Sequence, residues 1–149
     1  MEMQGEQLIP LPQQATWDAL NDTTVLKDCI PGCDAIDWQS DNEFLLTMTA
    51  KVGPVSAKFK GRMLLAEVDA PRAYTLQFEG QGGVAGFAKG EARVQLTPEG
   101  EFTRLSYGVK ANIGGKLAQV GARLIDGVAR KMAEQFFSAF NRRVSPAEQ

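Results

Sequence analysis

The sequence predicts an α+β fold in which a curved antiparallel sheet wraps around one long C-terminal helix. No proline occurs between Lys116 and Val144. Apolar residues recur there at steps of three and four, the spacing of one helical face. In the middle of the chain the hydrophobic period changes to two, which indicates strands. Because the strands form one run and the helices lie outside it, the pattern favours α+β over α/β.

The N-terminal part predicts one strand followed by two short helices. Residues 2–9 predict a strand that ends at a proline-containing segment. Residues 12–20 predict the first helix and residues 23–30 the second. A Pro-Gly turn at residues 31–32 then separates these helices from the strands that follow.

Six further strands are expected, because apolar and polar residues alternate between turn signals such as Gly-Pro and Pro-Glu-Gly. Their expected ranges are residues 34–39, 43–51, 56–68, 72–80, 86–97 and 102–113. Gly114–Gly115 then opens the C-terminal helix, which would span about 29 residues and roughly 43 Å. A helix of that length with one apolar face has to bury that face against the sheet.

Many strand positions that should face the helix carry small side chains, for example Ala88, Gly90 and Ala92. A dense core needs volume at such positions. The helix itself contains Gly121 and Gly127, each of which costs roughly 1 kcal/mol against alanine. Close helix–sheet packing and room for a ligand explain these residues equally well. We expect the second, a cavity between helix and sheet.

Charge is distributed unevenly along a chain whose net charge is −2. Residues 1–109 hold 9 Lys or Arg and 15 Asp or Glu, whereas residues 110–149 hold 7 and 3. The basic C-terminal part suits an acidic partner or lipid headgroups, and a solvated helix face is the alternative. The sequence shows no signal peptide and no membrane span. We therefore expect a cytoplasmic protein whose contact with a membrane is peripheral, at the inner face.

The residue types exclude several kinds of chemistry. The chain has no histidine, the commonest general base and metal ligand. Its two cysteines alone cannot build a usual zinc site. Three residues separate Cys29 from Cys33, not the two of a thioredoxin-like motif, and we expect both thiols to be reduced and partly buried. No carboxylates pair at inward positions, so we expect neither catalysis nor a tightly bound metal or cofactor.

Two further patterns have simple structural explanations. Residues 80–86 nominally contain G-x-G-x-x-A, but a dinucleotide site needs a helix directly afterwards, and residues 87–97 alternate like a strand. We expect these glycines to let two strands bend over a cavity mouth. Lys58, Lys60 and Arg62 form a basic stripe, yet the chain is acidic overall and offers no aromatic platform. We therefore expect no nucleic-acid binding.

Several stretches together carry a family resemblance that covers nearly the whole chain. They are residues 1–22, Ile30–Cys33, 51–55 with 59–63, 114–126, and the motif Phe136-Phe137-x-x-Phe140. In these stretches the chain resembles the G-subunit family of carbon monoxide dehydrogenase. That family belongs to the START/Bet v1-like (SRPBCC) superfamily, whose fold is the helix-grip fold.

The resemblance implies a non-catalytic protein with an apolar pocket. Genes of the family commonly lie beside those of molybdenum-containing CO dehydrogenases and related hydroxylases. Its proposed roles are maturation or membrane recruitment of the enzyme and passage of a quinone. Some relatives carry a further C-terminal membrane anchor, whereas this sequence ends at Gln149, so we expect no stable membrane attachment.

We expect a hydrophobic molecule to bind between helix and sheet, an isoprenoid quinone first and a lipid second. The alternatives are an adaptor with a filled core that only docks a partner enzyme and, with less support, a small hydrolase or cyclase. Ordinary core packing is the alternative for every residue expected at the ligand. These residues are Phe44, Met48, Phe59, Met63, Phe78, Tyr107, Leu124, Val128, Met132 and Phe136.

The end of the C-terminal helix is a candidate contact surface for a membrane or a partner. Phe136, Phe137 and Phe140 cannot all point one way on a helix. We expect Phe137 or Phe140 near the surface beside Arg142 and Arg143, since an exposed aromatic residue next to arginine suits a lipid interface. The alternative is that all three rings cap the core. Residues 1–144 should form one domain, followed by a short flexible tail at 145–149.

Overall fold

The computed structural model describes residues 1–145 and confirms the predicted fold class. Seven antiparallel strands form one sheet in the order β1-β7-β6-β5-β4-β3-β2. Apart from Ser145, the expected flexible tail lies outside the described residues. The elements are β1 (Glu2–Ile9), α1 (Gln13–Leu20), α2 (Thr23–Cys29), β2 (Cys33–Ser40), β3 (Glu43–Val52), β4 (Val55–Asp69), β5 (Ala73–Gln81), the 3-10 turn η1 (Gly83–Ala85), β6 (Phe87–Glu99), β7 (Phe102–Gly114), α3 (Lys116–Gln119) and α4 (Ala122–Val144).

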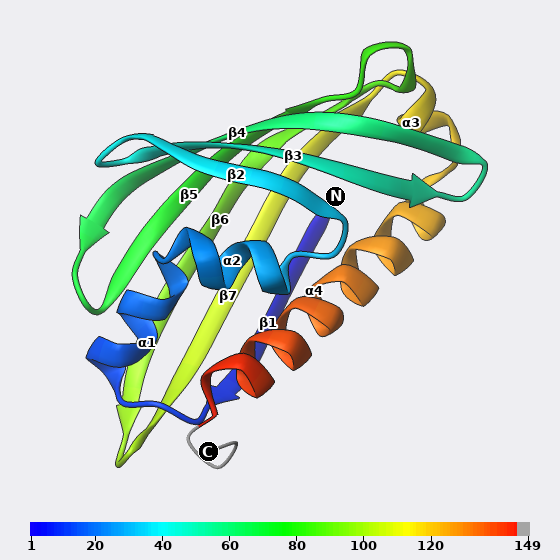
Figure 1. Ribbon diagram of the computed structural model, residues 1–149. Helices are drawn as coiled ribbons and strands as arrows, with labels where there is room; N and C mark the ends of the chain where they lie inside the picture. The colour runs from blue at the N-terminus through cyan, green and yellow to red at the C-terminus, as the bar shows by residue number, and fades with distance from the viewer. Residues whose placement is uncertain (146–149) are drawn as a thin grey trace.

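The sheet is strongly curved, and its helices α1, α2 and α4 lie on the concave side (Figure 1). Strands β2 to β7 follow one another as a meander, and β1 joins at the far edge beside β7. Irregular register contributes to the curvature, because bulges bend and twist a strand. In β4 the pairing with β5 shifts between Ala66 and Asp69, where Glu67 has a φ of 49°. Strand β2 shifts register twice against β3.

The predicted alternation is present in the sheet. Directly opposed residues of antiparallel strands share a face, and one such row joins Phe44, Met63, Phe78, Gly90 and Ala111 across five strands. This row lies on the concave side, as expected. The row therefore carries large side chains in β3, β4 and β5 and small ones in β6 and β7.

The predicted continuous helix from Lys116 to Val144 is wrong in its first turns. Residues Val120 and Gly121 separate the four-residue α3 from the 23-residue α4. Gly121 caps α4 with φ 98° and ψ 148°, a conformation that is nearly restricted to glycine. The apolar spacing continues across the break, so periodicity alone did not reveal it.

The prediction of an exposed phenylalanine at the end of the C-terminal helix is also wrong. Phe137 is 9 % exposed and Phe140 is fully buried. The last turns of α4 lie against α2 and β1, so more than one face of the helix is covered. Tyr107 stacks on Phe137, with 5.4 Å between ring centroids. The rings therefore cap the core.

The two arginines at this end of α4 do remain exposed. Arg143 donates to Asp28 of α2 over 3.3 Å. Because both partners are exposed, this ion pair contributes little to stability.

Candidate functional site

An apolar cavity of about 410 Å³ lies between the sheet and helices α2 and α4. Its volume is within the range of small-molecule sites, ~300–1,000 Å³. The cavity forms because α4 does not pack flat on the sheet. No residue of α4 before Phe136 is buried, whereas Phe137 and Phe140 reach the core. The structure therefore contains the predicted cavity.

Small residues make room on both sides of the cavity. Ala92 of β6 faces it from the sheet, and Ala129 and Ala133 face it from α4. The helix glycines do not contribute to this space. A Cβ atom built at Gly121 or Gly127 would meet nothing within 4 Å, and both residues are exposed. Neither close packing nor ligand space explains these two glycines.

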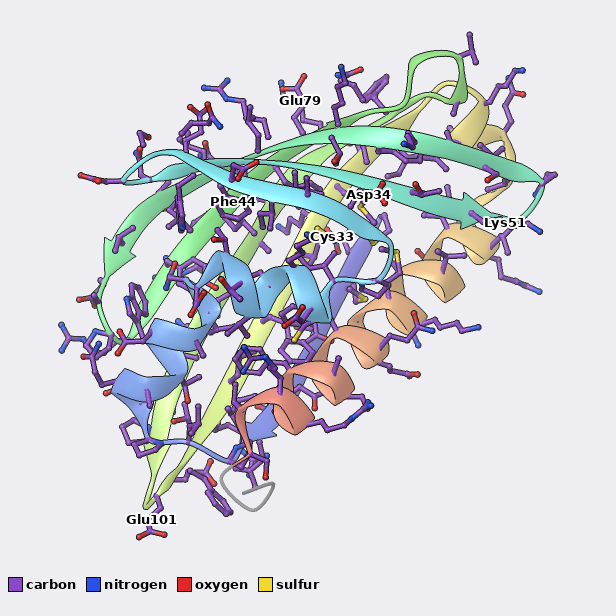
Figure 2. All side chains as sticks on the ribbon, in the orientation of Figure 1. Cys33, Asp34, Phe44, Lys51, Glu79 and Glu101 are labelled. Atoms are coloured by element: carbon purple, nitrogen blue, oxygen red, sulfur yellow. The ribbon has the colours of Figure 1, made fainter. Side chains whose placement is uncertain are left out.

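The structure brings half of the predicted ligand-lining residues to the cavity wall: Phe44, Met63, Tyr107, Met132 and Phe136. They come from β3, β4, β7 and α4. Phe44 is labelled in Figure 2, on the concave side of β3. Phe136 continues the wall toward the buried end of α4 and stacks against Phe140.

The other five predicted residues lie elsewhere. Phe78 shares the cavity side of the sheet but stands opposite Gly90 and does not line the space. Met48 packs against the buried cluster around Phe44. The ring of Phe59 lies over Gly82.

Leu124 and Val128 miss the cavity because the first turns of α4 stand away from the sheet. Leu124 is 39 % exposed, and its side chain contacts Gly53 in the β3–β4 turn. Val128 lines a shallower neighbouring pocket. The helical spacing placed both on the correct face but could not show how far that face lies from the sheet.

Sequence reasoning missed several residues of the wall. Tyr74 and Leu76 of β5 line the cavity, and they have the same parity along the strand as Phe78, so the alternation contained the signal. Leu26 of α2 and Ile30 after it also line the cavity. Nothing in the sequence indicated that α2 would close the space between the two sheet edges.

The cavity wall is almost entirely apolar and carries no charge among the described residues. Its polar side chains belong to Asn21, Tyr74 and Tyr107. The Asn21 amide donates to the Trp17 carbonyl over 2.9 Å. Burial raises the pKa of Tyr74 far above its ordinary value. Burial also raises the pKa of Tyr107, and the negative charge of Glu134 adds to the effect. Both phenols therefore stay neutral, and the cavity suits an uncharged molecule, since a buried charge needs a partner.

A shallower pocket of about 290 Å³ adjoins the cavity between β3 and α4. It shares Pro31 and Met132 with the cavity wall. Lys51 and Lys131 stand at this pocket and are exposed. Figure 2 shows Lys51 at the β3–β4 end of the sheet. We call this pocket, with its two lysines, the basic rim.

The cysteines and carboxylates offer no further site in residues 1–145. Cys29 and Cys33 are free thiols, and burial raises the pKa of both. No group of three His, Cys, Asp or Glu residues in the described part of the chain is placed to hold a metal ion. No helix in that part is long and apolar enough to cross a membrane.

A family model for the G subunit of carbon monoxide dehydrogenase (CoxG) matches residues 5–145. The chain belongs to this family. The match confirms the resemblance inferred from the sequence. No curated protein sequence matches the chain significantly.

Solved structures support the same fold assignment. A conserved protein from Geobacillus kaustophilus is 27 % identical with a TM-score of 0.91, over 97 % of this chain and 95 % of that one. A START superfamily protein from Mycobacterium smegmatis is 13 % identical with a TM-score of 0.74, over 96 % of each chain. The Zhui aromatase/cyclase from Streptomyces sp. R1128 is 9 % identical with a TM-score of 0.73, over 100 % of this chain and 96 % of that one. At such identities the last two show the fold alone.

Proposed function

We propose that this CoxG family member is a non-catalytic accessory protein that binds a hydrophobic small molecule in the apolar cavity. The observation that carries the proposal is the uncharged cavity of about 410 Å³, which α4 leaves open by standing away from the sheet. A filled core would place apolar side chains in this space, because protein interiors are normally close-packed. The alanines at the wall instead preserve the space.

We propose an isoprenoid quinone as the ligand, with a lipid as the second choice. An uncharged apolar molecule suits this wall, to which the described residues contribute no charged side chain. Met3, Met63 and Met132 line the cavity, and their flexible thioethers adapt to ligands of irregular shape. The partner we propose is a molybdenum-containing CO dehydrogenase or a related hydroxylase, on the basis of the family to which the chain belongs.

The basic rim is the surface that we propose for peripheral contact with a membrane. It adjoins the cavity, so a ligand could pass between the cavity and the contacted surface there. We propose it in place of the end of α4, which the sequence suggested as the contact surface, because Phe137 and Phe140 are buried there.

Two alternatives follow from the same fold. A ligand-free adaptor would use only its outer surface to dock an enzyme. An aromatase/cyclase shares the fold, but the cavity wall of this chain offers no carboxylate within the described residues, and carboxylates are its remaining candidates for acid–base catalysis.

Solvent extraction followed by mass spectrometry tests the ligand-binding proposal against the adaptor. The purified protein should release a stoichiometric apolar compound. Ala133→Phe should abolish this recovery, because the new ring fills the cavity from α4. Ala122→Phe, at an exposed position of the same helix, should leave it unchanged. The adaptor is favoured if the wild-type extract contains no such compound and the protein takes up no added quinone or lipid.

A further inference from the structure

One tyrosine in the cavity wall is buried without a polar partner. Tyr74 of β5 is 7 % exposed. It lies opposite Val94, which in turn lies opposite Tyr107, so all three share the concave face. The ring of Trp17 in α1 packs edge-on against Tyr74, with 5.3 Å between centroids. These contacts hold the Tyr74 ring in the wall of the cavity.

The hydroxyl group of Tyr74 makes no hydrogen bond within residues 1–145. Burial is the sole cause of the raised pKa of Tyr74, with no contribution from a hydrogen bond or a charge. Among the same residues, one side-chain oxygen or nitrogen atom is fully inaccessible and also lacks a hydrogen-bond partner. That atom is Oδ1 of Asn141, not the Tyr74 oxygen. The Tyr74 oxygen is therefore not sealed, and the residue that carries it lines the cavity.

Other buried hydroxyl groups are satisfied by the fold itself. Thr16 donates to the Pro12 carbonyl over 3.0 Å, and Thr103 donates to the Leu11 carbonyl over 2.7 Å. Both threonines are fully buried. Buried polar groups normally find such partners, because leaving one unpaired is costly. Tyr74, which lines the cavity, has no such partner within the described residues.

We propose that Tyr74 is the polar anchor of the cavity and donates a hydrogen bond to a neutral oxygen acceptor, such as a carbonyl, on an otherwise apolar ligand. This inference rests on the proposed ligand-binding function and narrows its ligand class. The phenol stays protonated and is therefore a donor at neutral pH. A carboxylate or phosphate does not fit, because no cationic side chain of residues 1–145 lines the cavity and a buried anion needs one.

The position of Tyr74 also orients the ligand. Tyr74 belongs to the buried cluster formed with Leu20, Val94, Leu105 and Phe137, at the end of the sheet where β5 begins. The basic rim lies at the other end of the strands, where β3 ends. The oxygen-bearing end of the ligand therefore lies deep in the cavity, and its apolar remainder extends toward the basic rim.

Tyr74→Phe tests the anchor with little risk to the fold, because the variant keeps the ring against Trp17 and removes a hydroxyl that the fold does not use. The probe is 6-propionyl-2-(dimethylamino)naphthalene, whose emission shifts to the red when its carbonyl accepts a hydrogen bond. The matched probe carries a propyl group in place of the propionyl group and has no carbonyl. Thr97→Val is the control variant, since it removes one hydroxyl group from an exposed position of β6 that does not line the cavity.

In Tyr74→Phe, affinity for the ketone probe should fall about 2- to 12-fold, the value of one neutral hydrogen bond. The emission of the bound ketone should also shift to the blue. Affinity for the propyl probe should stay the same or rise, and Thr97→Val should bind the ketone like wild type. In Tyr74→Phe, an equal change in affinity for both probes, or no change for either, would overturn the anchor and leave the ligand-binding function intact. An equal loss of affinity for the ketone in Thr97→Val would also overturn it. If wild-type protein binds neither probe, the proposed function fails and the anchor fails with it.

Discussion

Gly121 and Gly127 differ in backbone conformation, and this difference decides what an added methyl group does. Gly127 lies inside α4, is exposed and has open space around its Cα. Gly127→Ala should raise stability by about 0.5–1 kcal/mol through helix propensity. Gly121 has a φ of 98°, so Gly121→Ala should lower stability by about 1–3 kcal/mol through backbone strain.

Urea denaturation of the two alanine variants measures this pair of opposite effects. Each variant adds one methyl group at an exposed site, so each serves as the control for the other. If both variants were stabilised, α4 would extend through Gly121 as the apolar spacing predicts.

Phe140 anchors the C-terminal end of α4 in the core. It is fully buried and stacks on Phe136, with 5.7 Å between centroids. Phe140→Ala should lower the free energy of unfolding by about 3–5 kcal/mol, the usual cost of removing a buried ring. Leu45→Ala, on an exposed strand position, should change it by about 0.5 kcal/mol or less. Urea denaturation measures both variants. If Phe140→Ala lowered the free energy of unfolding only slightly, Phe140 would be an exposed residue, as the sequence predicted.

For individual residues, the sequence predicted the inward-facing side chains of the strands more accurately than it predicted the buried side chains of the C-terminal helix. Alternation in β3 and β4 placed Phe44 and Met63 correctly, because a strand has only two faces. On a helix the buried arc depends on what surrounds it. The last turns of α4 meet α2 as well as β1, so Phe137 is buried although it points about 100° away from Phe136.

Among the elements, the seven strands and the two short helices were predictable because turn residues punctuate them. Helix α1 ends and α2 begins within the segment Asn21–Asp22, where the sequence showed a stop signal. The break before α4 was not predictable, because a glycine in a helical pattern either continues the helix or caps a new one. The cavity depends on how α4 packs against the sheet. Small residues in the sequence were enough to predict that a cavity exists, but not to identify every residue of its wall.

Helix α2 closes the concave side of the sheet, and its first turn depends on one cap. The Asp22 carboxylate accepts a hydrogen bond from the Thr24 amide over 2.9 Å. Asp22→Ala should lower the free energy of unfolding by about 0.5–2 kcal/mol, since the amide loses its partner. Asp22→Asn keeps an acceptor and should retain most of the stability in the same denaturation assay. If Asp22→Asn lost as much as Asp22→Ala, charge and not the cap would explain the effect.

Across the whole molecule, exposed charged side chains stand at both ends of the sheet. Figure 2 shows Lys51 at one end and Glu101 at the other. Lys131 lines the same pocket as Lys51, and both lysines are exposed and form no ion pair within residues 1–145. At the other end, Glu99 pairs with Arg104. The basic charge that the sequence showed after residue 109 is therefore divided, with Lys131 at the basic rim and Arg142 and Arg143 at the far end of α4.

The basic rim should bind anionic membranes more strongly than the far end of α4 does. Each lysine near such a surface contributes about 1 kcal/mol, so Lys51→Gln with Lys131→Gln should weaken binding to phosphatidylglycerol-containing vesicles by roughly 30-fold. Arg142→Gln with Arg143→Gln removes the same charge at the opposite end and should have a much smaller effect. Added salt should weaken wild-type binding, because exposed charges are screened.

Co-sedimentation with vesicles measures the binding of all three proteins, and circular dichroism confirms that they are folded. Equal losses in the two double variants would mean that net charge alone attracts the protein, and a larger loss in the arginine variant would place the contact at the end of α4.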